Sequence, residues 1–395
     1  MMKVTKLNHI KIREAIKYLI SNYELDEIDD DEIRLGNAKI YIPFPRESIT
    51  HTIDEFVKYI DEYSSLEIID NTTVKTNRFT QKVVLSSAKP INYIYDEINL
   101  EYDNLNSIKI RLIENPILIG LAASKIGVYD KYATPCSSYH AVEIEYKSQH
   151  HRLPHTEEEK ILNSYLFELS FRVKDAIVYS KISESGYYDD YEEKSKISVK
   201  LNDLMEFNDG MQLYTKALTT YDTEIVFIYF YKIIEYYSPI VSRITSYELM
   251  TKKLDSIKTQ NLTSDFLKSI FSLAQSYNLS QSDGELASTV LSECVDVVEL
   301  YKYLPSTIQK KISKAVQFEN GSIDYSFSKE KLLAISNLIG KILYSTRNQI
   351  VHAKSNYQSN NFECPPENLA ELNNFLSIAT YNIIRWYSRL PTHLK

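Results

Sequence analysis

The chain has 395 residues, 44% of them hydrophobic, which is enough for two or three domains with cores of their own and excludes a disordered tail. Its formal net charge of −8 at pH 7 argues against a protein that coats nucleic acid without sequence preference. The cysteines are scattered, so we expect neither disulfides nor a structural zinc site. The N-terminus lacks the apolar core of a signal peptide, and no apolar run approaches the ~20 residues that cross a bilayer. We therefore expect a cytoplasmic protein without a membrane segment.

The first 150 residues mix helical and strand-like patterns. Apolar residues at helical spacing predict helices over 6–23 and 53–63. Short runs with strand-like alternation predict strands over 33–35, 40–42, 83–85, 108–112 and 142–146. We therefore expect an α+β domain over residues 1–150, without a recognisable catalytic signature.

Residues 151–201 are typical of a connection between two domains. Pro154 interrupts the chain, and Thr156 with Glu159 forms a capping-box pattern that predicts a helix beginning at Thr156. An acidic, tyrosine-rich stretch over 186–193 predicts a loop after that helix.

From residue 202 to residue 395 the pattern is almost wholly helical, which predicts a helical bundle. The segment 222–237 is apolar nearly all round, with Lys232 and Glu235 as its conspicuous charges, so we expect it at the centre of the bundle. The predicted helices cover 205–219, 222–237, 246–258, 264–275, 285–303, 306–316, 328–353 and 366–388.

The helix predicted over 328–353 carries Arg347, Asn348 and His352 near its end, within a region (301–395) that has twelve Lys and Arg against six Asp and Glu. An arginine neutralises the negative charge that develops on a phosphorane-like transition state, and a histidine moves the proton of an attacking ribose hydroxyl. These side chains are therefore suited to cleaving a phosphodiester without a metal. On an ideal helix Asn348 and His352 share a face, whereas Arg347 lies about 140° around from His352. A pocket that uses both needs a loosened helix end or a second copy of the chain.

The spacing of Arg347 and His352 resembles the R-x(4–6)-H motif of the HEPN superfamily, which favours a polar residue such as Asn348 after the arginine. The apolar stretch Tyr-Phe-Tyr-Lys-Ile-Ile-Glu-Tyr-Tyr is similar to the early helix of the ApeA-like and MauJ-like HEPN groups, which carry an acidic residue at a place comparable to Glu235. The resemblance covers residues 202–395 and implies an all-α HEPN-type bundle there.

This resemblance implies a metal-independent endoribonuclease that cleaves RNA by attack of the 2′-hydroxyl in the composite cleft of a homodimer, with no cofactor. In that mechanism Arg347 stabilises the phosphate, His352 acts as general base or acid, and Asn348 positions the phosphate or the imidazole. Glu235 would orient the catalytic cation and Lys354 would attract RNA. Anti-phage defence by abortive infection follows from the resemblance alone, with a phage-derived or cellular trigger bound by the N-terminal domain.

Three other interpretations stay open. Arg347 and His352 also suit an ordinary helix end, where cations are favoured and an imidazole can cap the last turn. A HEPN module without catalysis would bind a nucleotide or RNA, or act as a dimerisation scaffold, although the presence of both motif residues favours the enzyme. A role as a nucleotidyltransferase partner or antitoxin lacks a carboxylate pair with a Gly-Ser signature.

Two further groups of residues have a weaker chemical pattern. His150, His151 and His155 have no carboxylate or cysteine at a spacing that would complete a zinc site, so we expect no metal. Cys136 and His140 have no third group in view to orient them as a nucleophile and base. The phosphate-binding glycine motifs and H-E-x-x-H are absent from the sequence.

Overall fold

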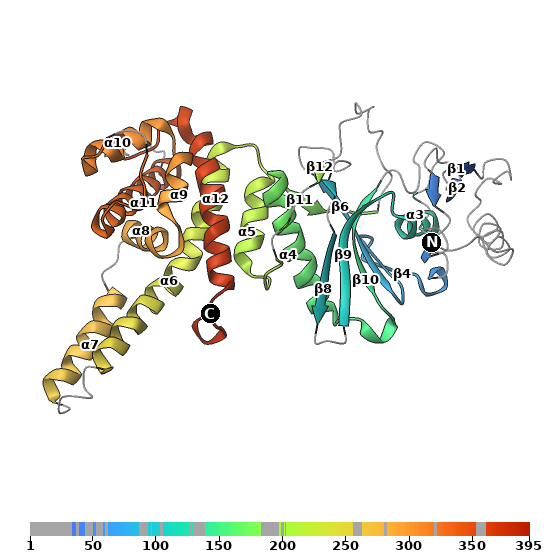
Figure 1. Ribbon diagram of the computed structural model, residues 1–395, viewed down its shortest axis with the longest axis horizontal. Coiled ribbons are helices and arrows are strands. Elements are labelled where there is room, and N and C mark those ends of the chain that lie inside the picture. The colour runs from blue at the N-terminus through green and yellow to red at the C-terminus, as the bar shows by residue number, and fades with distance from the viewer. Residues whose placement is uncertain are drawn as a thin grey trace. The chain divides into compact units, whose positions relative to one another are not determined.

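The computed structural model divides the chain into two compact units, Met1–Asp203 and Leu204–Lys395. The first unit contains an antiparallel sheet and the second is mostly helical (Figure 1), which confirms the expected succession of an α+β region and a helical region. The residues that the structure describes are 58–59, 62–86, 106–126, 128, 139–182, 201, 203–255, 263–279, 283–319, 322–352 and 361–395, together with the backbone of 34–36, 39–43, 50–52, 94–95, 97–102 and 197–198.

Antiparallel pairing builds the main sheet of the first unit, in the order β4-β5-β6-β10-β9-β8, and β11 also pairs with β6. The register places Val142 of β10 between Lys82 of β6 and Leu112 of β9. The predicted strands 83–85, 108–112 and 142–146 are confirmed within it. The strands of this sheet are β4 Glu67–Ile69, β5 Thr73–Lys75, β6 Phe79–Ser86, β8 Glu97–Tyr102, β9 Asn106–Glu114, β10 His140–Tyr146 and β11 Ile177–Tyr179.

Two smaller sheets accompany the main one. β1 (Arg34–Gly36), β2 (Lys39–Pro43) and β3 (Thr50–Thr52) are antiparallel, which confirms the strands predicted over 33–35 and 40–42. β7 (Ile94–Tyr95) and β12 (Ile197–Ser198) form a parallel pair. The helix predicted over 6–23, most of the one over 53–63 and the loop over 186–193 lie outside the described residues.

The two faces of the main sheet carry different helices because side chains alternate along β6. Phe79 and Val83 pack in one core with α3 (Ile117–Lys125), a short helix that the sequence patterns did not predict. Thr80 and Lys82, on the opposite face, bond to Glu158 and Glu159 of the helix α4, His155–Val173.

Helix α4, which we expected within a connecting segment over 151–201, belongs to the first unit. The expected capping box is wrong: α4 begins at His155, one residue earlier, with Pro154 as N-cap and no side-chain cap bond. Glu158, which is 1% exposed, instead turns to the sheet and accepts hydrogen bonds from Lys75, Thr80, Tyr146 and Arg152. This carboxylate network attaches α4 to the sheet, because a buried charge must be fully partnered.

Helices of the second unit pack around α6, which contacts α5, α7, α8, α11 and α12. Its buried residues Phe227, Phe230, Ile233 and Ile234 confirm the central place expected for the apolar segment 222–237. The helices are α5 Asp209–Leu218, α6 Thr223–Asp255, α7 Ser264–Leu279, α8 Asp283–Cys294, α9 Val297–Leu300, α10 Ser306–Val316, α11 Lys329–Val351 and α12 Leu369–Ser388. Short 3₁₀ turns lie at Tyr63–Ser65, Gln149–His151, Tyr301–Tyr303, Pro366–Asn368 and Thr392–Leu394.

Several of the expected helix boundaries in this unit are wrong: α5 begins at Asp209 and not at residue 205, and α7 ends at Leu279 and not at residue 275. The helices expected over 222–237 and 246–258 are one continuous helix, α6, with Pro239 inside it. Pro239 has no backbone N–H for the carbonyl of Glu235, four residues earlier, and the hydroxyl of Ser238 donates to that carbonyl at 3.0 Å instead. Conversely, the helix expected over 285–303 is broken before Asp296, whose carboxylate caps the new helix α9.

Among the described residues, no helix is long and apolar enough to cross a membrane.

Candidate functional site

The candidate site lies at the C-terminal end of α11. An N-cap hydrogen bond and a row of buried side chains fix the position of this helix. Ser328 caps the helix by accepting a hydrogen bond from the backbone N–H of Lys331. The buried residues recur at three- and four-residue intervals and hold the helix against α8 and α6. They are Ile335, Ser336, Ile339, Gly340, Ile342, Leu343, Ser345 and Thr346.

Arg347 is held at the edge of the bundle by two neighbours. One Nη2 atom lies 3.7 Å from Oε1 of Glu235 on α6, and Nη1 donates a hydrogen bond of 3.1 Å to Oδ1 of Asn348. The side chain of Arg347 is 27% exposed and that of Glu235 is 39% exposed, so the ion pair is partly shielded from water without being buried. The guanidinium therefore keeps a fixed position while remaining accessible to an anion.

The environment of Arg347 is more acidic than the sequence suggested. Burial raises the pKa of Glu235, the positive charge of Arg347 lowers it, and the negative charge of Asp283, at the start of α8, raises it again. The balance leaves that pKa above its usual range. The positive charge of Arg347 thus offsets part of the effect of burial on Glu235.

Tyr231 lies one helical turn before Glu235 on α6 and belongs to the same cluster. Burial raises the pKa of its hydroxyl, and the negative charges of Glu235 and Asp283 raise it further. The hydroxyl is buried and makes no hydrogen bond to the part of the chain that the structure describes. Sequence reasoning missed Tyr231 and Asp283. The i, i+4 spacing of Tyr231 and Glu235 was the available signal for the tyrosine, but Asp283 comes from another helix.

His352 is the C-cap residue of α11 and is exposed. Its backbone N–H donates to the carbonyl of Asn348 at 2.8 Å, which continues the helical pattern to the last residue. Because Arg347 and His352 are five residues apart on one helix, their side chains leave it about 140° apart. The structure brings Arg347, Asn348 and Glu235 together but does not bring the imidazole to the guanidinium. Lys354 lies outside the described residues.

Within the described part of the chain, the weaker sequence patterns form no second site. His151 Nδ1 lies 2.6 Å from the hydroxyl of Ser148 in a 3₁₀ turn, and His155 begins α4. His140 lies in β10, where burial lowers its pKa to about 4, and Cys136 lies outside the described residues. Where the chain is described, no three His, Cys, Asp or Glu side chains are grouped in a way that could hold a metal ion.

Comparison with protein-family models, curated proteins and solved structures finds no match for this chain.

Proposed function

We propose that this chain is a metal-independent endoribonuclease of the HEPN type, in which Arg347 and His352 act on one scissile phosphate of an RNA strand. The observation that supports the proposal most is the fixed, accessible guanidinium of Arg347. It is held by Glu235 and Asn348 at the end of the helix that also carries an exposed imidazole.

The divergence of the two side chains favours a composite site. In a two-fold dimer, an exposed imidazole at one helix end can face the guanidinium of the partner subunit, and an isologous two-fold contact is the commonest oligomer geometry. We therefore propose that His352 of one protomer acts together with Arg347 of the partner subunit. The HEPN resemblance of residues 202–395 implies the same arrangement.

The proposed reaction transfers one proton from the 2′-hydroxyl and one proton to the 5′-oxygen, and it exchanges one bond at phosphorus. The 2′-oxygen of a ribose attacks the adjacent phosphorus while His352 takes the hydroxyl proton as general base. Arg347 stabilises the additional negative charge on the five-coordinate phosphate, and Asn348 keeps the guanidinium oriented toward it. The bond from phosphorus to the 5′-oxygen breaks, and that oxygen is protonated by an imidazolium or by water. The products are a 2′,3′-cyclic phosphate and a 5′-hydroxyl.

The biological role that fits this proposal is RNA cleavage in anti-phage defence by abortive infection, with the first unit binding a phage-derived or cellular trigger. This part of the proposal rests on the family resemblance alone.

The test is cleavage of single-stranded RNA by the purified full chain in EDTA, with analysis of the RNA ends. Removing an electrostatic stabiliser or a general base usually lowers kcat about 10²- to 10⁴-fold, so Arg347→Ala and His352→Ala should both lose activity to that extent. Arg389→Ala and His393→Ala are matched controls, because both residues are exposed in the same unit and lie outside the motif.

Wild-type rates in Arg347→Ala or His352→Ala would refute the assignment. Tight binding of RNA or a nucleotide without any cleavage would instead favour a non-catalytic HEPN module.

A further inference from the structure

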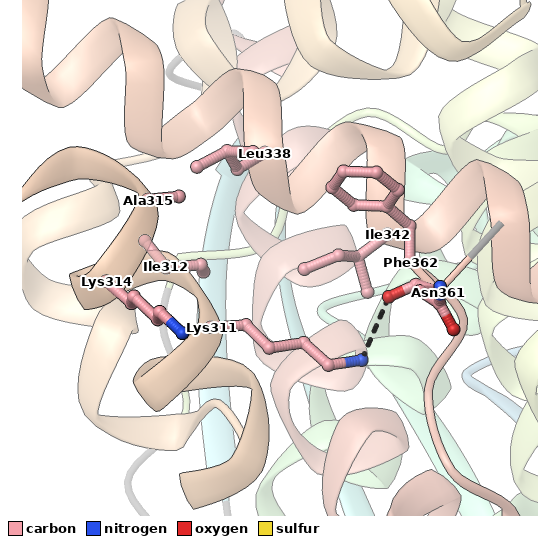
Figure 2. Close-up of a pocket in the computed structure, with 8 residues that line it drawn as sticks. All are labelled: Lys311, Ile312, Lys314, Ala315, Leu338, Ile342, Asn361 and Phe362. Carbon is pink, nitrogen blue, oxygen red and sulfur yellow. Dashed lines mark hydrogen bonds between the residues drawn. The ribbon is translucent and has the colours of Figure 1, made fainter.

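A pocket of about 440 Å³ opens between α10 and α11 and is closed on one side by Asn361 and Phe362 (Figure 2). Its floor is apolar, formed by Ile312 of α10 and by Leu338 and Ile342 of α11. Pockets for small molecules usually have about 300–1,000 Å³ and a largely apolar lining with a few polar groups. This pocket has both properties and no role in the reaction proposed above.

Positive charge surrounds this apolar floor. Lys311 and Lys314 line the pocket from α10, and among the described residues no acidic side chain lines it. Lys341, one residue before Ile342, places its ammonium 3.8 Å from the ring centroid of Phe362, which adds a third cation beside the pocket wall. A negatively charged ligand would therefore meet attraction without a competing carboxylate.

The two lysines of the pocket have different tasks. The ammonium of Lys311 donates a hydrogen bond of 3.3 Å to the carbonyl oxygen of Asn361 (Figure 2). It donates a second hydrogen bond of 3.3 Å to the carbonyl oxygen of Glu363, and so fixes the wall that carries Phe362. Lys314 is exposed and makes no hydrogen bond or ion pair to the described residues. Lys311 thus shapes the pocket, whereas the charge of Lys314 is available to a ligand.

We propose that this pocket binds a small ligand that combines a planar aromatic ring system with an anionic group. The ring system would lie on the aliphatic floor against Phe362, and the anionic group would contact Lys314 at the rim. In proteins that bind nucleotides, aromatic side chains stack on the base and nearby cations attract the phosphate. A mononucleotide and an aromatic carboxylate share this chemistry, and both fit the volume.

The pocket is separate from the candidate cleavage site and does not depend on it. Ile342 and Arg347 are five residues apart on α11, so their side chains leave the helix about 140° apart. A ligand on Ile342 therefore does not contact the guanidinium. The wall is nevertheless tied to the same helix, because the backbone N–H of Cys364 donates to the hydroxyl of Thr346 at 2.9 Å.

The test is titration of the full chain with 8-anilinonaphthalene-1-sulfonate, a fluorescent probe with an aromatic body and one negative charge. Lys314→Glu should weaken binding about tenfold, because it replaces attraction by repulsion at the rim. Ala315→Phe should abolish binding at this pocket by filling its mouth from an exposed position. Lys310→Glu is the matched control, since Lys310 is exposed on α10 and does not line the pocket. It should bind the probe as the wild type does.

Competition experiments then show which class of ligand the pocket binds. Displacement of the probe by ADP assigns a nucleotide, and displacement by 1-naphthoate but not ADP assigns an aromatic carboxylate. Equal affinity of the Lys314→Glu, Ala315→Phe and Lys310→Glu proteins would overturn the proposal. Displacement by neither competitor, or equally well by uncharged naphthalene, would overturn it too.

Discussion

Replacing Gly340 with alanine should destabilise the helical unit, because Gly340 lies where α11 makes its closest approach to α8. A Cβ atom at this position would meet three atoms of Ser288 on α8, with the hydroxyl oxygen at 2.3 Å and the backbone Cα and N both at 2.7 Å. The hydroxyl of Ser288 also donates to the carbonyl of Asn337 on α11, at 3.3 Å. The clash is with backbone, so rotating a side chain cannot relieve it.

The expected loss in the free energy of unfolding follows from how far α8 and α11 must separate. Carbon atoms in good contact lie about 3.5–4.0 Å apart, so α8 and α11 would have to move apart by roughly 1 Å. Overpacking of this kind typically costs about 1–3 kcal/mol, and a displaced backbone belongs at the upper end of that range. Alanine has a higher helix propensity than glycine by about 1 kcal/mol, which offsets part of the loss. We expect Gly340→Ala to lower the free energy of unfolding by about 1–2 kcal/mol.

The assay uses the only tryptophan in the sequence, Trp386, which lies in α12. Its fluorescence during urea unfolding reports the helical unit without a tryptophan signal from the first unit. Gly284→Ala is the matched control, because a Cβ there would meet only the side chain of Tyr344, at 3.2 Å or more. That variant should not lower stability, because the higher helix propensity of alanine offsets a small movement of the Tyr344 side chain. Equal stability of Gly340→Ala and the wild type would refute the packing of α8 against α11 described above.

Three further predictions concern ionisable groups whose pKa values are shifted. Glu235→Gln should leave the helical unit at least as stable at pH 7, because burial holds the pKa of Glu235 above its usual range. A raised carboxyl pKa makes the native state gain stability as pH falls toward the ordinary carboxyl pKa, so urea unfolding followed by tryptophan fluorescence should show that gain in the wild type and not in Glu235→Gln. Glu158→Gln should destabilise the first unit by about 3 kcal/mol, measured by amide hydrogen exchange in β6, because it leaves Lys75 and Arg152 without their buried partner. Burial raises the pKa of Glu158 but the hydrogen bonds from its partners lower it overall, so the stability it contributes is lost in acid, below the ordinary range of a carboxyl. Burial lowers the pKa of His140 to about 4. The native state therefore loses stability as pH falls from ~6.5, the ordinary pKa of histidine, toward 4, because the unfolded chain binds the proton more readily. The loss in the free energy of unfolding is at most about 3 kcal/mol. A His140→Asn protein that lost stability over the same pH range to the same extent would contradict this.

Much of the helical unit was predictable because its helices have regular apolar stripes and clear ends. The expected helix over 306–316 matches α10, and the expected helix over 328–353 differs from α11 by a residue or two at each end. The continuity of α6 through Pro239 was not predictable, because proline normally ends or kinks a helix. The hydrogen bond that Ser238 donates to the carbonyl of Glu235 depends on the rotamer of its side chain, which the sequence does not specify. Helix α3 was missed because a short segment that is apolar all round has no period to detect.

The candidate site was predictable in part. Local spacing on one helix is visible in a sequence, so Arg347, Asn348 and His352 could be named, and the family resemblance drew attention to Glu235. The contribution of Asp283 was not predictable, because it depends on how α8 packs against α6 and α11. The pocket beside Phe362 was hidden for the same reason, since its walls come from three separate segments of the chain.

The central claim is that His352 of one protomer and Arg347 of the partner subunit act on the same phosphate. Co-expression of Arg347→Ala and His352→Ala chains with different affinity tags, followed by purification on both tags, isolates the mixed dimer. In that dimer one of the two composite sites keeps both residues, so RNA cleavage should recover to about half the wild-type rate while each variant alone stays inactive. A mixed dimer as inactive as its parents, or a chain that forms no dimer at all, would contradict the composite site.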